Sequence, residues 1–215
     1  MPGDVADGGD LVGESLACRR GERLVFAGID IRLPAGGALL LTGANGSGKS
    51  SLLRLLATLL EPADGRLLWG GAPVAEDLPR YRAGLHYVGH LDAIKPALTV
   101  RETLRFWAAL RGAARPSIEA ALDAFAIEPL ADWPCRWLSA GQRQRLALAR
   151  LVAAPAAIWL LDEPIAALDA DGERRLAAAI VAHRGQGGRV VVATHQTLPL
   201  DDATHLSLED FSAAG

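Results

Sequence analysis

The spacing of hydrophobic positions changes several times along the chain, and each change indicates a different element. Residues 11–33 alternate weakly on either side of Gly21, which predicts two antiparallel strands joined by a turn. Continuous apolar runs at Ala38–Thr42 and Ile158–Leu161 are typical of strands buried on both faces. Further strands are expected at Arg66–Trp69, Leu85–Val88, Arg189–Ala193 and residues 203–208.

Helical segments lie between these strands. They are expected from the glycine-rich turn at 43–48 to about Leu60, over 99–127 with breaks at Gly112 and Pro116, from a Ser139 cap to about Ala153, and over Gly172–His183. This alternation predicts an α/β fold with a mainly parallel sheet core and an N-terminal antiparallel β subdomain. The helical stretch at about 99–153 is expected to be a subdomain inserted between sheet strands, so that residues 1–215 form a single domain.

Composition and charge exclude several classes of protein. Of the 215 residues 50% are apolar, enough for a substantial core, and the net charge of −3 is spread along the chain without a basic block. We therefore expect no nucleic-acid partner. The N-terminus is unlike a signal peptide, and the longest apolar run, Leu151–Leu161, is far shorter than the roughly 20 residues that span a bilayer. If the protein drives transport, another chain must cross the membrane.

The two cysteines, Cys18 and Cys135, occur in unrelated contexts and form no C-x-x-C pair. We expect two reduced thiols rather than a zinc site or a disulfide. Cys135 lies between Trp133 and Trp137, an arrangement that also allows a heme ligand. The simpler interpretation is a buried thiol, because a thiol beside aromatic residues usually packs in a core.

The turn after the strand Ala38–Thr42 has the pattern G-x-x-x-x-G-K-[ST] of a phosphate-binding loop, with a plain glycine-rich turn as the alternative. Its glycines let successive N–H groups face one phosphate, and the following helix adds its positive end. Lys49 is expected to reach the β- and γ-phosphates, and the Ser50 hydroxyl to bind Mg²⁺. Lysine occurs only here and at Lys95, which makes its presence in the loop informative. The expected ATP-binding residues are Gly43, Ala44, Asn45, Gly46, Ser47, Gly48, Lys49, Ser50 and Ser51.

A second candidate site follows the apolar strand that ends at Leu161. Asp162 at the end of this strand can hold Mg²⁺, directly or through water. Glu163 points elsewhere and can polarise an attacking water. A surface acidic turn is the alternative, but the phosphate-binding loop upstream favours a catalytic pair.

The sequence LSAGQ at 138–142 resembles the LSGGQ signature of the ABC (ATP-binding cassette) ATPases, with Ala140 in place of one glycine. The segments ALD at 167–169 and TH at 194–195 complete the ordered set of motifs of that family. Each short motif alone is weak, since a serine before a helix is usually only a cap. Together, in order and over nearly the whole chain, they are specific.

This resemblance implies a P-loop NTPase fold of the ABC type, whose two copies pair head to tail when nucleotide binds. Ser139, Gly141 and Gln142 of one copy would contact the ATP that is held by the P-loop of the other. Asp169 would lie in the D-loop at that interface, and His195 would contact the γ-phosphate and the attacking water. The implied catalytic residues are Glu163, His195 and Lys49.

The chain departs from the common ABC pattern at two positions. Where these domains usually have a glutamine, after the strand Leu85–Val88, this chain offers His90, whose imidazole can also touch Mg²⁺ or accept from water. The aromatic residue that stacks on adenine is normally near residue 20, where Arg20 could stack through its guanidinium plane instead.

The segment from Tyr87 to His90, followed by Lys95 and Thr99, resembles the CcmA family, the ATP-binding subunits of the cytochrome c maturation heme-export system. This resemblance implies a peripheral protein on the cytoplasmic face of the inner membrane. Its integral membrane partner would be of the CcmB type, with CcmC and CcmD associated, and the loop from about His90 to Trp107 would dock it. An ATPase of another small-substrate ABC transporter, or a soluble ABC-type assembly ATPase, is the alternative.

Overall fold

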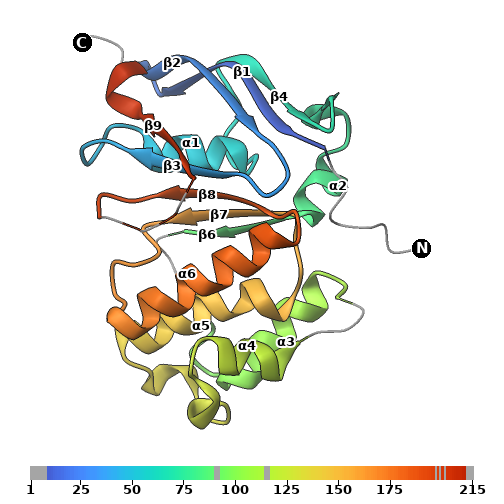
Figure 1. Ribbon diagram of the computed structural model, residues 1–215, viewed down its shortest axis with the longest axis vertical. Helices are drawn as coiled ribbons and strands as arrows, with labels where there is room; N and C mark the ends of the chain where they lie inside the picture. Colours follow the sequence, from blue (N-terminus) through green and yellow to red (C-terminus); the bar gives the residue numbers. More distant parts are fainter. Residues whose placement is uncertain are drawn as a thin grey trace.

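A four-stranded antiparallel sheet and a five-stranded parallel sheet face each other across helix α1 (Lys49–Leu56), and further helices cover the other side of the parallel sheet (Figure 1). The computed structural model describes residues 9–89, 93–113, 117–196, 198, 200 and 202–211. The predicted α/β fold of the ABC type is confirmed.

The antiparallel sheet begins with the hairpin that residues 11–33 predicted. Its strands lie in the order β2-β1-β4-β5 and are β1 (Leu11–Arg20), β2 (Arg23–Leu33), β4 (Asp64–Trp69) and β5 (Ala72–Pro73). Gly21 has a φ of 60° in the turn between β1 and β2, a backbone conformation that favours glycine.

The parallel sheet contains the apolar runs of the sequence. Its strands lie in the order β6-β7-β8-β3-β9 and are β6 (Leu85–Val88), β7 (Ile158–Asp162), β8 (Arg189–Ala193), β3 (Ala38–Thr42) and β9 (Thr204–Ser207). Every residue of β7 and β8 is buried, since both faces of these central strands are covered. The prediction that the apolar runs Ala38–Thr42 and Ile158–Leu161 form buried strands is confirmed.

The side chains of β7 alternate between two cores. Ile158 and Leu160 pack with α1 and the antiparallel sheet, whereas Trp159 and Leu161 pack with the helices on the other face. Full burial of each leucine is worth about 1.5–3 kcal/mol. The parallel sheet is thus the shared wall of both cores.

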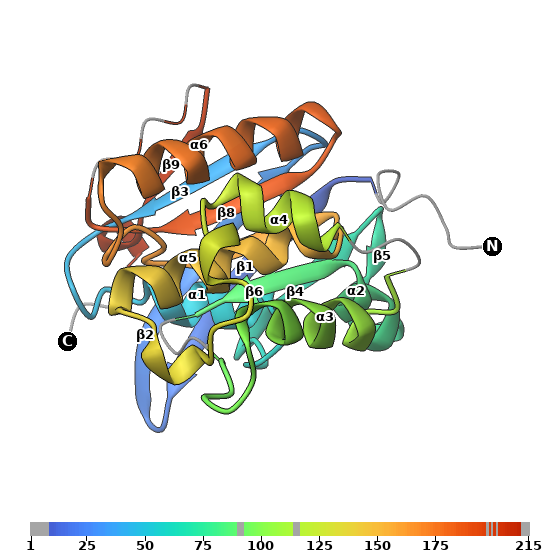
Figure 2. The ribbon, with the colours of Figure 1, turned by 90° about the horizontal axis from the view of Figure 1, so that it is seen from below.

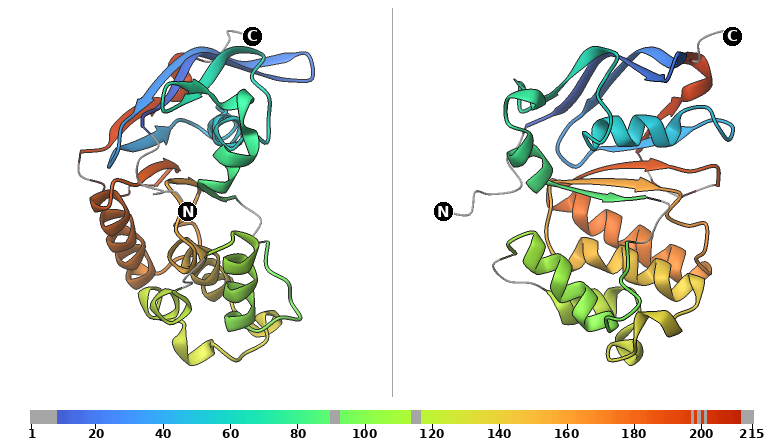
Figure 3. Two further views of the ribbon diagram at one scale, coloured as in Figure 1. Left: turned by 90° about the vertical axis from the view of Figure 1, so that its right-hand side faces the viewer. Right: turned by 180° about the vertical axis from the view of Figure 1, so that it is seen from behind.

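The remaining helices follow the predicted segments with shifted ends. They are α2 (Leu78–Ala83), α3 (Val100–Leu110), α4 (Ile118–Ala124), α5 (Ala140–Ala153) and α6 (Ala170–Gly185), with short 3₁₀ helices η1 (Val74–Glu76), η2 (Glu128–Leu130), η3 (Cys135–Trp137) and η4 (Leu208–Phe211). Figure 3 shows α3, α4, α5 and α6 below the parallel sheet, and Figure 2, seen from below, shows α3 and α4 beside α5.

Helix α1 ends at Leu56, so the predicted end at about Leu60 is wrong. Thr58 takes a left-handed φ of 56°, and the N–H groups of both Leu59 and Leu60 donate to the Arg54 carbonyl. The chain closes the helix with this turn before it reaches the proline at position 62. Sequence periodicity carries no signal for such a local stop.

Candidate nucleotide-binding site

The carboxyl ends of β3, β7 and β8 lie at one edge of the parallel sheet, because Leu41 and Asp162 both pair with Ala193. The P-loop leaves β3 at this edge, the acidic pair follows β7, and residues 194–195 follow β8. Ligands of open parallel sheets bind outside the carboxyl ends of the strands. The topology therefore brings together three motifs that are far apart in the sequence.

Glycine is required in the P-loop for two separate reasons. Gly43, Gly46 and Gly48 have φ values of 132°, 85° and 108°, which side chains rarely adopt. In addition, a Cβ at Gly48 would lie 2.8 Å from Val25 and 3.1 Å from Phe26 of β2. Strand β2 therefore packs directly against the end of the loop where α1 begins.

Lys49 is the first residue of α1, and only 6% of it is exposed. Its Nζ donates to the carbonyl oxygens of Gly43 and Ala44, at 2.7 and 3.1 Å, so the ammonium lies inside the curve of the loop. Within the described part of the chain, the buried Ser47 Oγ has no hydrogen-bond partner. An ammonium and a buried hydroxyl without a partner, both in one loop, fit a loop built to receive phosphate oxygens.

Ser50 and Asp162 meet at the same edge. Ser50 Oγ donates to Asp162 Oδ1 at 2.9 Å, and Asp162 is 5% exposed. No group of three or more metal-binding histidine, cysteine or acidic side chains occurs among the described residues. This donor set suits Mg²⁺, which binds through one or two protein oxygens and takes its other ligands from phosphate and water.

Glu163 and His195 form a second pair next to the first. Glu163 takes a left-handed φ of 50°, and its N–H donates to the Ala193 carbonyl at 2.8 Å. This conformation turns its carboxylate towards His195, whose Nδ1 lies 3.0 Å from Glu163 Oε2. The histidine side chain is 50% exposed and the glutamate side chain 21%, so water can reach the pair.

The signature segment caps helix α5. Ser139 accepts from the Gln142 N–H at 3.2 Å, and the Gln142 side chain accepts from the Ser139 N–H at 2.9 Å, which is a reciprocal capping box. A Cβ at Gly141 would lie 2.9 Å from the Ala167 carbonyl oxygen, so glycine is needed for this close approach. The cap satisfies two of the N–H groups that a helix start leaves unpaired.

A pocket of about 380 Å³ opens beside this helix start, lined by Ala126, Ile127, Leu130, Ser139, Gly141, Gln142, Arg145, Ala167 and Asp169. The P-loop residues, all of which are described, do not line it. Within one chain the signature and the P-loop therefore do not share this pocket.

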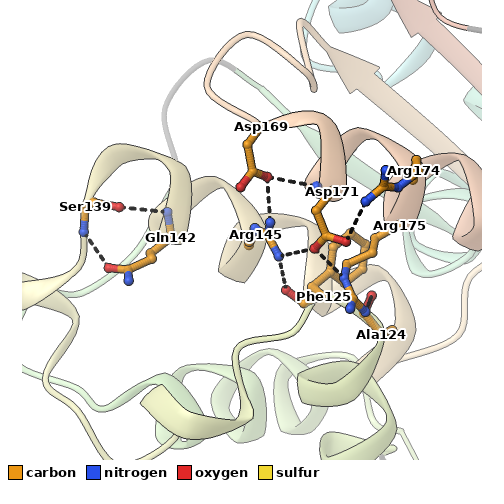
Figure 4. A network of polar contacts seen from close by, with 10 residues as sticks. Ala124, Phe125, Ser139, Gln142, Arg145, Asp169, Asp171, Arg174 and Arg175 are labelled. Atoms are coloured by element: carbon orange, nitrogen blue, oxygen red, sulfur yellow. Dashed lines mark hydrogen bonds and ion pairs between the residues drawn. The ribbon is translucent and has the colours of Figure 1, made fainter.

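Arg145 joins three segments around this pocket, as Figure 4 shows. Its guanidinium donates to Asp169 Oδ1 at 2.5 Å, to Asp171 Oδ2 at 3.1 Å and to the Phe125 carbonyl at 3.1 Å. The Gly172 N–H, and then Arg145, hold the pKa of Asp169 below its usual range. Arg145 thus ties the signature helix to the segment that carries Asp169.

The remaining residues that the sequence placed at the nucleotide site differ in where the structure puts them. Ser51 lies in α1 and is 7% exposed, behind the loop. Arg20 is exposed at the end of β1, while Val25 and Phe26 are the side chains that pack on Gly48. His90 lies outside the described residues, so its expected role in binding Mg²⁺ stays a prediction.

Cys135 is a buried thiol. It is 1% exposed, its Sγ lies 3.3 Å from Thr103 Oγ1, and burial raises its pKa. An inward-facing thiol with a raised pKa is a poor metal ligand. The heme-ligand alternative therefore fails at this position.

Sequence reasoning missed two contacts of the site. Glu209 accepts a hydrogen bond from the Ala44 N–H at 2.8 Å, and Arg145 clamps Asp169. Arg145 lies three residues after the LSAGQ segment, so its place beside that motif was a signal for it. Glu209 lies 165 residues from Ala44 and has no local signal.

A P-loop, an acidic strand end and a capped signature helix on this two-sheet fold define an ABC-type ATPase. The family model described as ABC transporter matches residues 26–166. A chain from Pyrococcus furiosus, assigned as an ABC transporter ATP-binding protein, has a TM-score of 0.84 at 23% identity, over 95% of this chain and all of that one. This likeness supports the fold.

Closer relatives share one name. The cytochrome c biogenesis ATP-binding export protein CcmA of Rhodospirillum rubrum is 58% identical over 202 residues, which cover 94% of this chain and 87% of the relative. CcmA of Paramagnetospirillum magneticum is 50% identical over 205 residues, with 94% of each chain covered. The chain belongs to the ATP-binding proteins of ABC transporters and, within them, to the CcmA family. In the ranges that the structure describes, every helix is too short or too polar to cross a bilayer.

Proposed function

We propose that this protein is the ATP-hydrolysing subunit of an ABC complex that powers heme export, or the release of a heme chaperone, in cytochrome c biogenesis. Residues 1–215 act in it as one ATP-binding domain, with residues 99–153 as the helical subdomain. The hydrolytic role is supported by two hydrogen-bonded pairs, Ser50 with Asp162 and Glu163 with His195, which lie beside the P-loop at one edge of the sheet. The identity to CcmA proteins over 94% of the chain supports the pathway.

Triphosphate binding is assigned to residues 43–51. Lys49 would leave the carbonyls of Gly43 and Ala44 for the β- and γ-phosphates, and the Ser47 hydroxyl would gain the partner that it lacks among the described residues. Ser50 and Asp162 would hold Mg²⁺, which neutralises phosphate charge when bound. Arg20 stays our proposal for stacking on adenine.

Hydrolysis is assigned to Glu163 and His195. Glu163 accepts a proton from the water that attacks the γ-phosphorus, and ADP leaves as the bond between the γ-phosphorus and the bridging oxygen breaks. His195 holds the Glu163 carboxylate through Nδ1 at 3.0 Å and presents the rest of its ring to the γ-phosphate. The left-handed backbone at Glu163 keeps this carboxylate apart from Asp162, so the two acids serve different atoms.

Two copies are proposed to close around two ATP molecules. The pocket at Ser139 and Gly141 opens beside a helix N-terminus, which favours an anion, and it excludes the chain's own P-loop. A second copy would supply the triphosphate there, and symmetry would repeat the contact. Asp169 at the rim of the same pocket would then lie at the interface.

The membrane partner is proposed to dock on an exposed apolar surface, defined as Trp133, Trp137, Phe106 and Leu110. These side chains are 46%, 61%, 40% and 65% exposed. Two of them form an edge-to-face pair with ring centroids 6.3 Å apart, and Lys95 lies over the Phe106 ring. Aromatic residues with cations around them are typical of interface anchors.

This surface is continuous with the expected docking loop from about His90 to Trp107, although residues 90–92 lie outside the described part. The N–H groups of Cys135 and Arg136 donate to the carbonyls of Leu98 and Pro96, which joins the loop to η3. Ser139 lies two residues after the end of η3, so a partner on this surface would move the signature. An integral membrane partner of the CcmB type, with CcmC and CcmD, and a location on the cytoplasmic face of the inner membrane complete the proposal.

The test of the hydrolytic role is the substitution Glu163→Gln, which keeps the side-chain shape and removes the base. We expect ATP hydrolysis by the complex with its membrane partner to fall by about 10²-fold or more, while nucleotide binding is retained. Glu61→Gln, at an exposed glutamate just beyond α1, is the matched control and should leave the rate unchanged. Unchanged hydrolysis in Glu163→Gln would overturn the assignment.

The pathway is tested in cells. Deletion of the gene should abolish c-type cytochromes and leave b-type cytochromes at their normal level. Normal c-type cytochromes in the deletion strain would favour another small-substrate transporter. Recovery of the protein only in the cytosol, without a membrane partner, would favour a soluble assembly ATPase.

A further inference from the structure

The last described segment of the chain returns to the P-loop. Strand β9 pairs in parallel with β3, with Ser207 opposite Thr42, so the residues after both strands emerge at the same edge of the sheet. Leu208, the first residue of η4, is fully buried and fixes this segment to the core. Glu209 is therefore held beside the start of the P-loop.

The contact between the two segments is a charge-assisted hydrogen bond. The Ala44 N–H donates to Glu209 Oε1 at 2.8 Å, and a Cβ at Gly43 would lie 3.6 Å from Glu209 Cγ. The Ala44 carbonyl accepts from Lys49 Nζ and from the Ser47 N–H, each at 3.1 Å. Ala44 is thus held at both its polar groups, on opposite sides of the residue.

The contact of Ala44 with Lys49 and its contact with Glu209 respond differently when nucleotide binds. Lys49 must leave the loop carbonyls to reach phosphate, so its contribution to the shape of the empty loop is lost. The contact from Glu209 is made to an N–H and needs no change. A negative charge near a phosphate site has an electrostatic cost, which indicates that the hydrogen bond, rather than the charge, is the useful part of this contact.

We propose that Glu209 is a positioning residue for nucleotide binding: through the Ala44 N–H it holds the first turn of the P-loop while Lys49 moves from the loop to the phosphates. This inference rests on the proposed function of the same site. It assigns a role in ATP binding to η4, although that segment contains none of the motifs. It also predicts that a neutral acceptor of the same shape can replace the carboxylate.

The experiment compares Glu209→Ala, which removes the acceptor, with Glu209→Gln, which keeps it without the charge. Asp210→Ala is the matched control, because Asp210 is the exposed acidic neighbour in the same 3₁₀ turn. Binding of a fluorescent ATP analogue with Mg²⁺ is measured by titration of the purified chain, and hydrolysis is measured with the membrane partner. Thermal unfolding without nucleotide reports whether each variant is folded.

We expect Glu209→Ala to raise the Kd for the ATP analogue by about tenfold, because the variant loses one hydrogen bond to a charged group. The same variant should raise the KM for ATP, while kcat stays within about twofold of the wild type. Glu209→Gln should bind within about threefold of the wild type or more tightly, and Asp210→Ala should match the wild type. A Glu209→Ala protein that is less stable to heat, but still shows a raised KM with an unchanged kcat, also supports the proposal.

Equal or tighter binding by Glu209→Ala overturns the inference, as does weakening by Glu209→Gln of the same size as by Glu209→Ala. A fall in kcat alone also overturns it. Each of these outcomes leaves the proposed function standing if the wild type binds and hydrolyses ATP. Failure of the wild type to bind the analogue removes the proposed function itself, and the inference with it.

Discussion

Arg145 offers a sharp test of how the signature helix is tied to the rest of the site. Substitution by methionine keeps an unbranched, flexible stem and removes the guanidinium with its three contacts, to Asp169, Asp171 and the Phe125 carbonyl. The two aspartate side chains are 69% and 41% exposed, so water can replace the guanidinium around them. The carbonyl belongs to a fully buried residue and its hydrogen bond to Arg145 is partly buried, so water replaces this donor less readily than at the aspartates.

The cost of the substitution should therefore come mainly from this carbonyl. A buried acceptor without a partner costs about 1–3 kcal/mol. In a domain of this length 1 kcal/mol shifts the melting temperature by about 2–4 °C, so Arg145→Met should melt about 2–12 °C lower. Arg174→Met, at an arginine that is 75% exposed and also pairs with Asp171, should melt within about 2 °C of the wild type.

A second measurement reports the functional consequence. In the Glu163→Gln background, in which ATP is bound but not cleaved, size-exclusion chromatography follows formation of the dimer as ATP is added. Arg145→Met should require more ATP, because Asp169 loses its tie to the helix that begins at Ser139. A melting temperature within 1 °C of the wild type, together with the same ATP requirement, would refute the reasoning.

Two further predictions concern pH and docking. Burial, and then the nearby charge of Arg111, lower the pKa of His86 to about 3, so below pH 6.5 the unfolded chain binds a proton that the folded chain does not. Urea unfolding should therefore show that this residue makes the protein about 2 kcal/mol less stable at pH 5.0 than at pH 7.5. A loss of stability of the same size in His86→Gln, which has no imidazole, would contradict this assignment. The double substitution Trp133→Ser with Trp137→Ser should abolish co-purification with the membrane partner and spare nucleotide binding, whereas Leu59→Ser, at an exposed leucine beyond α1, should spare both.

The features predicted most accurately from the sequence are those that depend on neighbouring residues in the chain. Strands such as Ile158–Asp162 were found because burial on both faces leaves a continuous apolar run, and Lys49 and Asp162 were found because each follows or ends such a strand. The end of α1 was missed because it depends on one left-handed residue, Thr58. The short helix α2 was missed as well, because a helix of 6 residues capped by Asp77 is too short to show periodicity.

Contacts between distant segments could not be predicted in this way. The hydrogen bond from Ala44 to Glu209 exists because β9 pairs with β3, and strand order is a property of the whole sheet. The packing of Val25 and Phe26 on Gly48 likewise requires the antiparallel sheet to lie over the P-loop. Arg20 ends β1, whereas the side chains that pack on the loop belong to the neighbouring strand β2, and the adenine contact at Arg20 stays a prediction.

The place of α1 between the two sheets has a consequence for how ligand energy spreads through the molecule. Leu52, Leu53, Leu55 and Leu56 are at most 1% exposed and fill the space between both sheets. The first turn of this helix cannot melt alone without opening that space to water. Free energy gained by an anion at its tip therefore counts toward the cooperative unfolding of the entire domain, rather than toward the order of one loop.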